Sequence, residues 1–201
     1  MIHFDFMLEE LSAEEALRNL LPRIRQGATY RVHTFQGKQD LLSKLPDRLR
    51  CYRDWIQEGY RIVVLVDEDR DDCQALKQRL EDMAAQAGLL TLRASSNRAQ
   101  FQVINRLAIE ELEAWFFGDI EALLKAYPRL PKNLAQRKTY RDPDAILGGT
   151  WEALERVLKK AGYYPGGMPK VEVARKVSSY MDPNRNRSRS FAHFCDALRI
   201  P

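Results

Sequence analysis

The sequence predicts an α/β protein with a mostly parallel β-sheet flanked by helices and a helical C-terminal appendage. Residues 62–66 (Ile-Val-Val-Leu-Val) are an apolar run without alternation, which is typical of a strand buried on both faces of a parallel sheet. Strand patterns alternate with helical patterns as far as residue 120, as right-handed β-α-β crossovers require. Beyond residue 120 the strand patterns stop.

The first 120 residues contain five predicted strands with helical segments between them. The strand patterns cover residues 2–8, 31–35, 62–66, 89–93 and 101–109. The helical patterns cover residues 12–27, 40–58 and 71–87. Ser12 is the expected N-cap of the first helix, and Glu15 would complete a capping box with it.

A further helix is expected over residues 109–119, and its acidic residues are of interest. Its apolar face would pack on the sheet, leaving Glu111 and Glu113 on either side of that face. There they would reach the edge of the sheet where other carboxylates emerge. An ordinary amphipathic helix has the same pattern.

The C-terminal part reads as short helices separated by turns rich in Pro and Gly. The helical patterns cover residues 120–126, 151–161, 170–181 and 190–198. We expect residues 1–120 to form the α/β core and residues 121–201 a helical extension packed on it. Gly148-Gly149-Thr150 would either contact a phosphate at a helix N-terminus or be a connector in which Thr150 is the N-cap.

Composition favours a cytoplasmic, globular protein. Hydrophobic residues make up 45% and charged residues 30% of the 201. No apolar run approaches the roughly 20 residues needed to span a bilayer, and the N-terminus does not resemble a signal peptide. The three cysteines have no paired spacing, which argues against a disulfide framework or a structural zinc site.

Charge is unevenly distributed along the chain. Residues 120–201 hold 16 Lys and Arg against 8 Asp and Glu, a net charge of +8, whereas residues 1–119 carry −4. A polyanion drawn to a metal site would suit this asymmetry, as would ordinary solvated helix faces. The densest basic run contains Arg185, Arg187 and Arg189, which would contact a nucleic-acid backbone or lie in a solvated loop.

A cluster of acids directly follows the apolar strand at residues 62–66. Alternation places Asp67, Asp69 and Asp71 on one side of an extended segment and Glu68 on the other. Such like charges repel unless a cation neutralises them, and Mg²⁺ bound through carboxylates and water meets that need. The alternative is that these acids are solvated and cap the next helix.

Several common sites are excluded by their missing motifs. The chain has no GxGxxG after its first strand and no GxxxxGK[ST], which removes the ordinary dinucleotide-binding and P-loop interpretations. His3, His33 and His193 accompany no nucleophile motif, so a serine or cysteine hydrolase is disfavoured.

Three acidic blocks follow one another along the chain. The first block is Glu9-Glu-Leu-Ser-Ala-Glu14, and the second is a DxDxD-type motif at residues 67–71. The third, E-x-E-A-x-x-F-x-D, spans Glu111 to Asp119. This set resembles the Toprim fold and, more closely, the family of domain of unknown function 4276, a Toprim-like group related to the overcoming-lysogenization-defect nucleases. Residues 188–194 also resemble the closing segment of the family.

The resemblance implies roles for these acids. Glu9 would be a general acid/base and Asp67 and Asp69 would hold Mg²⁺ or Mn²⁺, with Glu9 close enough to share the metal. Asp71 would complete the metal site, and Glu113 would be a second catalytic carboxylate. The remaining acids of the blocks are secondary candidates: Glu10, Glu111 and Asp119. Glu10 departs from the common Toprim pattern, which has Gly at this position.

The resemblance also implies transfer at phosphorus. The first hypothesis is a metal-dependent nuclease acting on nucleic acid, DNA in preference to RNA, as the effector of a prokaryotic defence pair with a separate ATPase partner. No tyrosine is singled out for strand passage, so hydrolysis is favoured. The alternatives are a non-catalytic Toprim-fold binding module and a metal-dependent phosphoesterase acting on small nucleotides.

Overall fold

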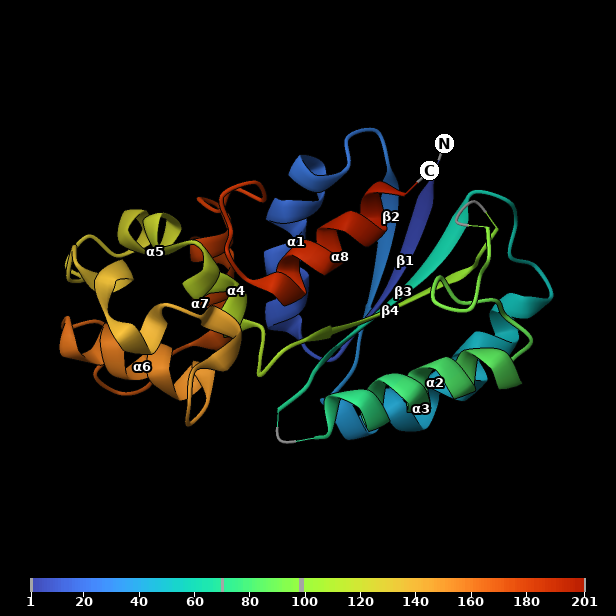
Figure 1. Ribbon diagram of the computed structural model, residues 1–201, viewed down its shortest axis with the longest axis horizontal. Coiled ribbons are helices and arrows are strands. Elements are labelled where there is room, and N and C mark those ends of the chain that lie inside the picture. The colour runs from blue at the N-terminus through green and yellow to red at the C-terminus, as the bar shows by residue number, and fades with distance from the viewer. Residues whose placement is uncertain (1, 70, 98–99, 201) are drawn as a thin grey trace.

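A computed structural model describes residues 2–69, 71–97 and 100–200. Four parallel strands form one sheet in the order β2-β1-β3-β4 (Figure 1). Their bounds are β1 His3–Leu8, β2 Thr29–Thr34, β3 Tyr60–Asp67 and β4 Val103–Ala108. The predicted α/β fold with a parallel sheet is confirmed.

Helices cover both faces of the sheet, so β3 is buried on both sides as its apolar run predicts. Helices α1 (Leu11–Ile24) and α8 (Arg189–Arg199) lie on one face, over Val63 and Leu65 of β3. Helices α2 (Lys38–Arg53) and α3 (Cys73–Gln86) lie on the other. Ile62, Val64 and Val66 pack there.

The helices after β4 extend from one end of the sheet before the chain returns to it. They are α4 (Glu113–Gly118), α5 (Ile120–Ala126), α6 (Thr150–Lys160) and α7 (Lys170–Ser178), with 3₁₀ turns at Leu134–Gln136, Lys138–Tyr140 and Pro143–Ala145. The last helix, α8, packs across β4 and α1. The C-terminal residues therefore supply one of the helices that cover the sheet.

Helix α7 lies along α1, and polar side chains fix the two helices together. Asn19 donates to the Ser178 hydroxyl (2.9 Å). Near the C-terminal end of α7, the Arg23 guanidinium donates to the carbonyls of Ser179 and Met181, each at 2.7 Å. These carbonyls have no partner within a helix, so α1 provides the C-terminal cap of α7.

The strand predicted at residues 89–93 is wrong. Only Thr91 pairs with β4, through an isolated parallel bridge to Val103. The Thr91 hydroxyl bonds to the buried Glu81 carboxylate, and Ser95 N donates back to the Thr91 carbonyl (3.0 Å). Because the chain turns immediately, the segment is too short to form a ladder.

Three predicted helix starts also differ from the structure. Glu10 is the N-cap residue of α1, and Ser12 lies inside the helix with its hydroxyl bonded to the Glu10 carboxylate. Gly149, not Thr150, is the N-cap residue of α6. The helix expected from residue 109 begins at Glu113, because Glu110 has a left-handed backbone conformation (φ 61°) that interrupts it.

Candidate acidic site at the carboxyl edge of the sheet

The strand order brings the three acidic blocks to one edge of the sheet. β1 lies between β2 and β3, with Leu8 opposite Leu65, and Asp67 at the end of β3 lies opposite Ala108 of β4. The chain moves from β1 to β2 on one side and then to β3 on the other. Open parallel sheets form their sites at such a reversal, beyond the carboxyl ends of the strands. Glu9 and Asp67 flank this position.

Hydrogen bonds join the loops that follow β1, β3 and β4. Asp67 N donates to Glu9 Oε2 (3.2 Å), and Glu110 N donates to Glu68 Oε2 (3.1 Å). Asp69 N donates to the Glu110 carbonyl (2.7 Å). Asp69 and Glu110 both have positive φ angles, 53° and 61°. Such backbone conformations in non-glycine residues are held by their surroundings and concentrate at functional sites.

The carboxyl groups of Asp67 and Glu9 are both harder to ionise than usual. Burial raises the pKa of Asp67 well above its usual range, and the neighbouring charges of Glu9 and Glu113 raise it further. Burial also raises the pKa of Glu9, against the hydrogen bond from Asp67 N, and Asp69 adds to the increase. The two groups therefore favour a proton or a cation between them.

Glu113 is the most deeply buried acid at this edge. It opens α4, is 1% exposed, and its Oε2 has no hydrogen-bond partner among the described residues. Burial raises the pKa of Glu113 to about 7, against the charge of Lys170 and with a contribution from Glu111. A carboxyl group that titrates near neutral pH is suited to proton transfer.

Lys38, which follows β2 at the start of α2, holds two of the predicted metal-binding acids. Its Nζ lies 2.7 Å from Asp69 Oδ2 and 2.8 Å from Asp71 Oδ2, and it also donates to the Glu68 carbonyl (3.0 Å). Burial lowers the pKa of Lys38, but the bonds to the two aspartates outweigh that effect and raise it. One oxygen of each aspartate is thus paired with an ammonium group.

Lys170 brings a second positive charge to the acids from the opposite direction. Its Nζ lies 3.8 Å from Glu10 Oε1 and over the ring of Trp151. Burial lowers the pKa of Lys170, but Glu113, Glu10 and Glu111 raise it more. Because α7 lies along α1 with its first turn beside Glu10, the fold holds this lysine at the acidic edge.

Other predicted acids have structural partners. Glu111 Oε2 accepts from the Thr150 hydroxyl (3.1 Å) and from Trp151 N (2.7 Å), which caps α6. Asp119 accepts from Ala122 N and Asp182 N and binds Arg185 through both carboxylate oxygens, each at 2.8 Å.

The predicted basic segment lies apart from the acidic edge. Arg185 is bonded to Asp119, and the backbone N of Arg187 donates to the Gly118 carbonyl (3.0 Å). Arg189 opens α8 and forms an exposed ion pair with Asp142 at 3.0 Å. Arg189 also lines a hollow, which is described below.

The structure therefore assembles most of the predicted acids and adds two lysines. The charges of Glu9 and Glu113 both act on Asp67, and Glu10 acts on all three carboxyl groups. Sequence reasoning missed Lys38 and Lys170. The available signal was position: each opens a helix directly after a Gly or Pro, at residues 37 and 169.

The donor set suits a hard divalent cation, although the acids are not gathered into a finished coordination shell. Among the described residues, no three His, Cys, Asp or Glu side chains are grouped so that they could hold a metal ion. The chemistry nevertheless fits: carboxylate oxygens are the ligands Mg²⁺ and Mn²⁺ prefer, and Glu113 Oε2 is buried without a partner. Glu9, Asp67 and Asp69 are the residues that would bind the ion.

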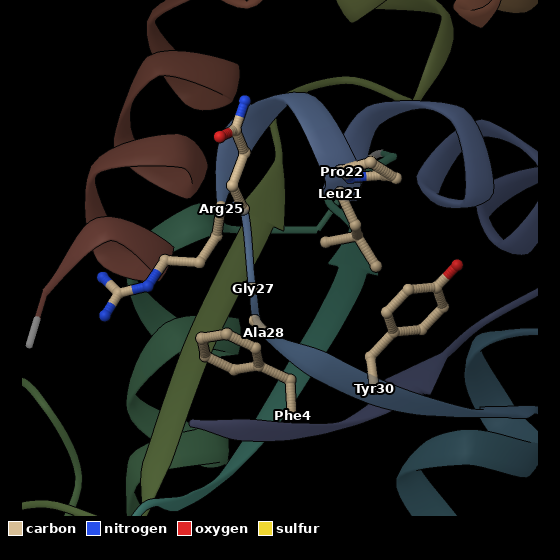
Figure 2. Close-up of a pocket in the computed structure, with 8 residues that line it drawn as sticks. Phe4, Leu21, Pro22, Arg25, Gly27, Ala28 and Tyr30 are labelled. Atoms are coloured by element: carbon tan, nitrogen blue, oxygen red, sulfur yellow. The ribbon is translucent and has the colours of Figure 1, made fainter. Parts of the chain in front are cut away.

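A separate hollow of about 250 Å³ lies at the opposite, amino end of the strands (Figure 2). Phe4, Leu21 and Tyr30 face into it, whereas Arg25 points away and donates to carbonyls at the end of α8. The hollow is mostly apolar and has no carboxylate in its lining.

None of the described helices is long and apolar enough to cross a membrane.

Comparison with known proteins identifies the family. A family model described as "Domain of unknown function (DUF4276)" matches residues 8–199. Because the match covers nearly the whole sequence, from the end of β1 to the end of α8, the chain belongs to this family. No curated protein and no solved structure gives a significant match.

Proposed function

We propose that this member of the DUF4276 family is a hydrolase that cleaves phosphodiester bonds with the help of Mg²⁺ or Mn²⁺. The single observation that carries the proposal is the group formed by Glu9, Asp67 and Glu113. These carboxyl groups follow three different strands, Glu113 as the first residue of α4. Burial is the main cause that raises the pKa of each, and neighbouring carboxylates add to the increase. Such an arrangement is costly for stability and typical of functional sites.

The chain's own residues would divide the work of the reaction. Glu9, Asp67 and Asp69 bind the metal, which when bound polarises the phosphoryl group and lowers the pKa of an attacking water. Glu113, with a pKa of about 7, accepts or donates a proton. Lys170 is placed beside these acids and stabilises negative charge on the phosphoryl oxygens.

The wider context of the proposal comes from the family resemblance. The order of acids after successive parallel strands supports a Toprim-like relationship to the overcoming-lysogenization-defect nucleases. On this basis the substrate is nucleic acid, DNA in preference to RNA, and a separate ATPase partner regulates the enzyme in the cytoplasm. Sequence and site together support hydrolysis better than strand passage.

A non-catalytic binding module is the second candidate, and one observation favours it. Lys38 already neutralises an oxygen of both Asp69 and Asp71, and Lys170 lies near Glu10. Internal lysines of this kind would let the acids persist without a metal. A small-nucleotide phosphoesterase would use the same acids as a nuclease and differs only in substrate.

Calorimetric titration of Mg²⁺ and Mn²⁺ tests the proposal, with cleavage of plasmid and single-stranded DNA followed on the same samples. The variants are Asp67→Asn and the control Asp54→Asn, whose exposed carboxylate pairs with Arg53 far from the acidic edge. We expect saturable metal binding and cleavage in the wild type and in the control. Both should be lost in Asp67→Asn, with cleavage reduced at least about a hundredfold.

The result that contradicts the proposal is equally defined. Metal binding that is the same in Asp67→Asn as in the wild type would remove Asp67 from the site. Binding that depends on Asp67 without cleavage of any nucleic acid would favour the binding module, and turnover of small phosphodiesters alone would favour the phosphoesterase.

A further inference from the structure

A second charged region lies on the far side of β4 from Asp67, between α3 and α8. Both helices pack against β4, on opposite faces of the sheet (Figure 1). Two hollows of about 520 and 490 Å³ lie between them. We call the joined hollows the basic groove, after its lining residues Lys77, Arg93, Arg106, Arg189 and His193.

Positive charge dominates the basic groove. None of the ion pairs among the described residues includes Arg93. Lys77 lies 4.0 Å from Glu81, and its ammonium group also donates to the carbonyl of Asn105. Burial and the charges of Arg106 and Arg93 together lower the pKa of Lys77 to about 8, despite the opposing effect of Glu81. The cations therefore repel one another, as the carboxylates do at the acidic edge. An anion in the groove would relieve that repulsion.

Two of the groove cations have an acidic neighbour: Lys77 lies near Glu81, and Arg189 forms an exposed ion pair with Asp142 at 3.0 Å. The acids that line the groove do not cancel its charge. Asp144 is buried, and its carboxylate is bonded to the Ser188 hydroxyl (2.7 Å) and to Arg189 N (2.6 Å). Asp196 is exposed, and its carboxylate lies 3.8 Å from the guanidinium of Arg199. Arg199 is also on α8 but does not line the groove.

The shape of the groove favours a polymer over a small anion. The two hollows share Lys77, Arg93, Arg106 and His193, so they form one elongated channel. Arg106 is held in the channel by hydrogen bonds to the carbonyls of Asn105 (2.9 Å) and His193 (3.1 Å). A strand of nucleic acid has phosphates at regular intervals and matches such a row of cations.

The near end of the groove meets the loops of the acidic site. Cys73 and Ile109 line it, at the start of α3 and just after β4. Ile109 directly precedes Glu110, whose backbone N donates a hydrogen bond to the Glu68 carboxylate. Glu68 also lies close enough to Cys73 to raise the pKa of its thiol, although burial is the main cause of that increase. A strand lying in the groove would thus continue toward the acidic edge.

We propose that the basic groove binds the sugar–phosphate backbone of a nucleic-acid strand and leads it to the acidic site. The first half of this inference stands on the groove alone, and the second half rests on the proposed hydrolysis. The groove, rather than the segment around Arg185 and Arg187, is then the main nucleic-acid contact.

Binding of a fluorescein-labelled DNA oligonucleotide, followed by polarisation in EDTA, tests the groove without cleavage. The test variant is Arg93→Ala/Arg189→Ala, in which both replaced side chains are exposed, so the fold should be kept. The control is Arg48→Ala/Arg79→Ala, which removes the same charge from exposed positions of α2 and α3 outside the groove.

We expect the groove variant to bind the oligonucleotide at least about tenfold more weakly at low salt. Its plot of log affinity against log salt should be shallower by about 1.5, because two phosphate contacts are lost. The control should keep the wild-type affinity and slope, and melting curves should show all proteins folded. Equal losses in the groove variant and the control would overturn the proposal, because they would reflect net charge alone.

Two further outcomes separate the possible ligands and the two proposals. Displacement of the oligonucleotide by an equal concentration of a nucleoside triphosphate would show that the groove takes a small polyphosphate, which contradicts a strand. Binding that depends on Arg93 and Arg189 without any cleavage would support the groove while the hydrolase proposal fails. Cleavage that depends on Asp67, with oligonucleotide binding unchanged in the groove variant, would support the hydrolase proposal and overturn the groove proposal.

Discussion

Glu113 and Asp119 stand at the two ends of the same short helix and are equally buried, yet their surroundings are opposite. Each is 1% exposed. Asp119 has hydrogen-bond partners for both oxygens, including the guanidinium of Arg185. Glu113 has an oxygen without any partner among the described residues, and burial raises its pKa to about 7.

The comparison teaches that partners, rather than burial, distinguish a structural acid from a candidate functional one. A buried carboxylate with a full set of donors stabilises the fold, because removing it leaves those donors unsatisfied. A buried carboxyl group without donors costs stability, which makes Glu113 a candidate for the function proposed above. The E-x-E-A-x-x-F-x-D pattern contains one carboxylate in each kind of surrounding, and spacing alone does not separate them.

The largest effect is expected for Asp119→Asn. The change replaces one carboxylate oxygen with an NH2 group, so the Arg185 guanidinium loses its bidentate partner. Either Ala122 N or Asp182 N also loses its acceptor. We expect the free energy of unfolding, measured with urea at pH 7 in EDTA, to fall by about 3 kcal/mol. Metal affinity should be unchanged.

Glu121→Gln is the matched control for this prediction. Glu121 also contacts Arg185, at 3.1 Å, but its side chain is exposed. Its loss should change stability by less than about 1 kcal/mol. Equal effects of the two substitutions would mean that Asp119 is not a structural acid.

The second prediction concerns Glu113→Gln and the pH dependence of stability. The folded-state pKa of Glu113, about 7, lies above the unfolded value of 4.5, so folding favours the protonated form. The contribution of protonated Glu113 to the free energy of unfolding is complete below pH 4.5. It is lost as the pH rises through about 7, which lowers the free energy of unfolding by about 3 kcal/mol. Glu113→Gln should remove that decrease and be more stable than the wild type at pH 8.

Urea denaturation between pH 4 and pH 8 in EDTA checks the second prediction. Glu9 and Asp67 also have raised pKa values and add slopes of the same sign, so the difference between the two curves isolates Glu113. Parallel curves for wild type and variant would show that Glu113 titrates in its ordinary range.

Much of the fold was predictable from the sequence, because periodicity and burial are local properties. The apolar run at residues 62–66 located the central strand, and the acids after it lie at the edge where we place the candidate site. The strand predicted at residues 89–93 does not form, although the residues have a strand-like pattern, because the chain turns after Thr91. Turns made by long-range partners, such as Glu81 with Thr91, leave no local signal.

The partners of the acids could not be predicted, because they come from distant parts of the chain. Lys170 reaches Glu10 only because α7 lies along α1, and Arg185 reaches Asp119 across a long connection. Position after a strand tells which residues share an edge, as it did for Glu9 and Asp67. It does not tell which of them are already paired.

The smallest effect is expected for Lys170→Met, which tests whether Lys170 acts on Glu113. Methionine keeps an unbranched stem beside the Trp151 ring and removes the charge that lowers the pKa of Glu113. The carboxyl carbon of Glu113, followed by NMR in EDTA, should therefore titrate at higher pH than in the wild type. Stability should change by less than about 1 kcal/mol.

Arg175→Met is the matched control for Lys170→Met. Arg175 is an exposed cation on the same helix, paired with Glu15 at 2.6 Å. Its loss should leave the Glu113 titration where it is, because the Arg175 charge is exposed, paired with Glu15 and screened by solvent. If the pKa of Glu113 rises equally in both variants, the change reflects the net charge of α7 and not a specific effect of Lys170. A titration that moves in Lys170→Met alone would establish a lysine and a buried acid acting on each other at the edge where the three strands end.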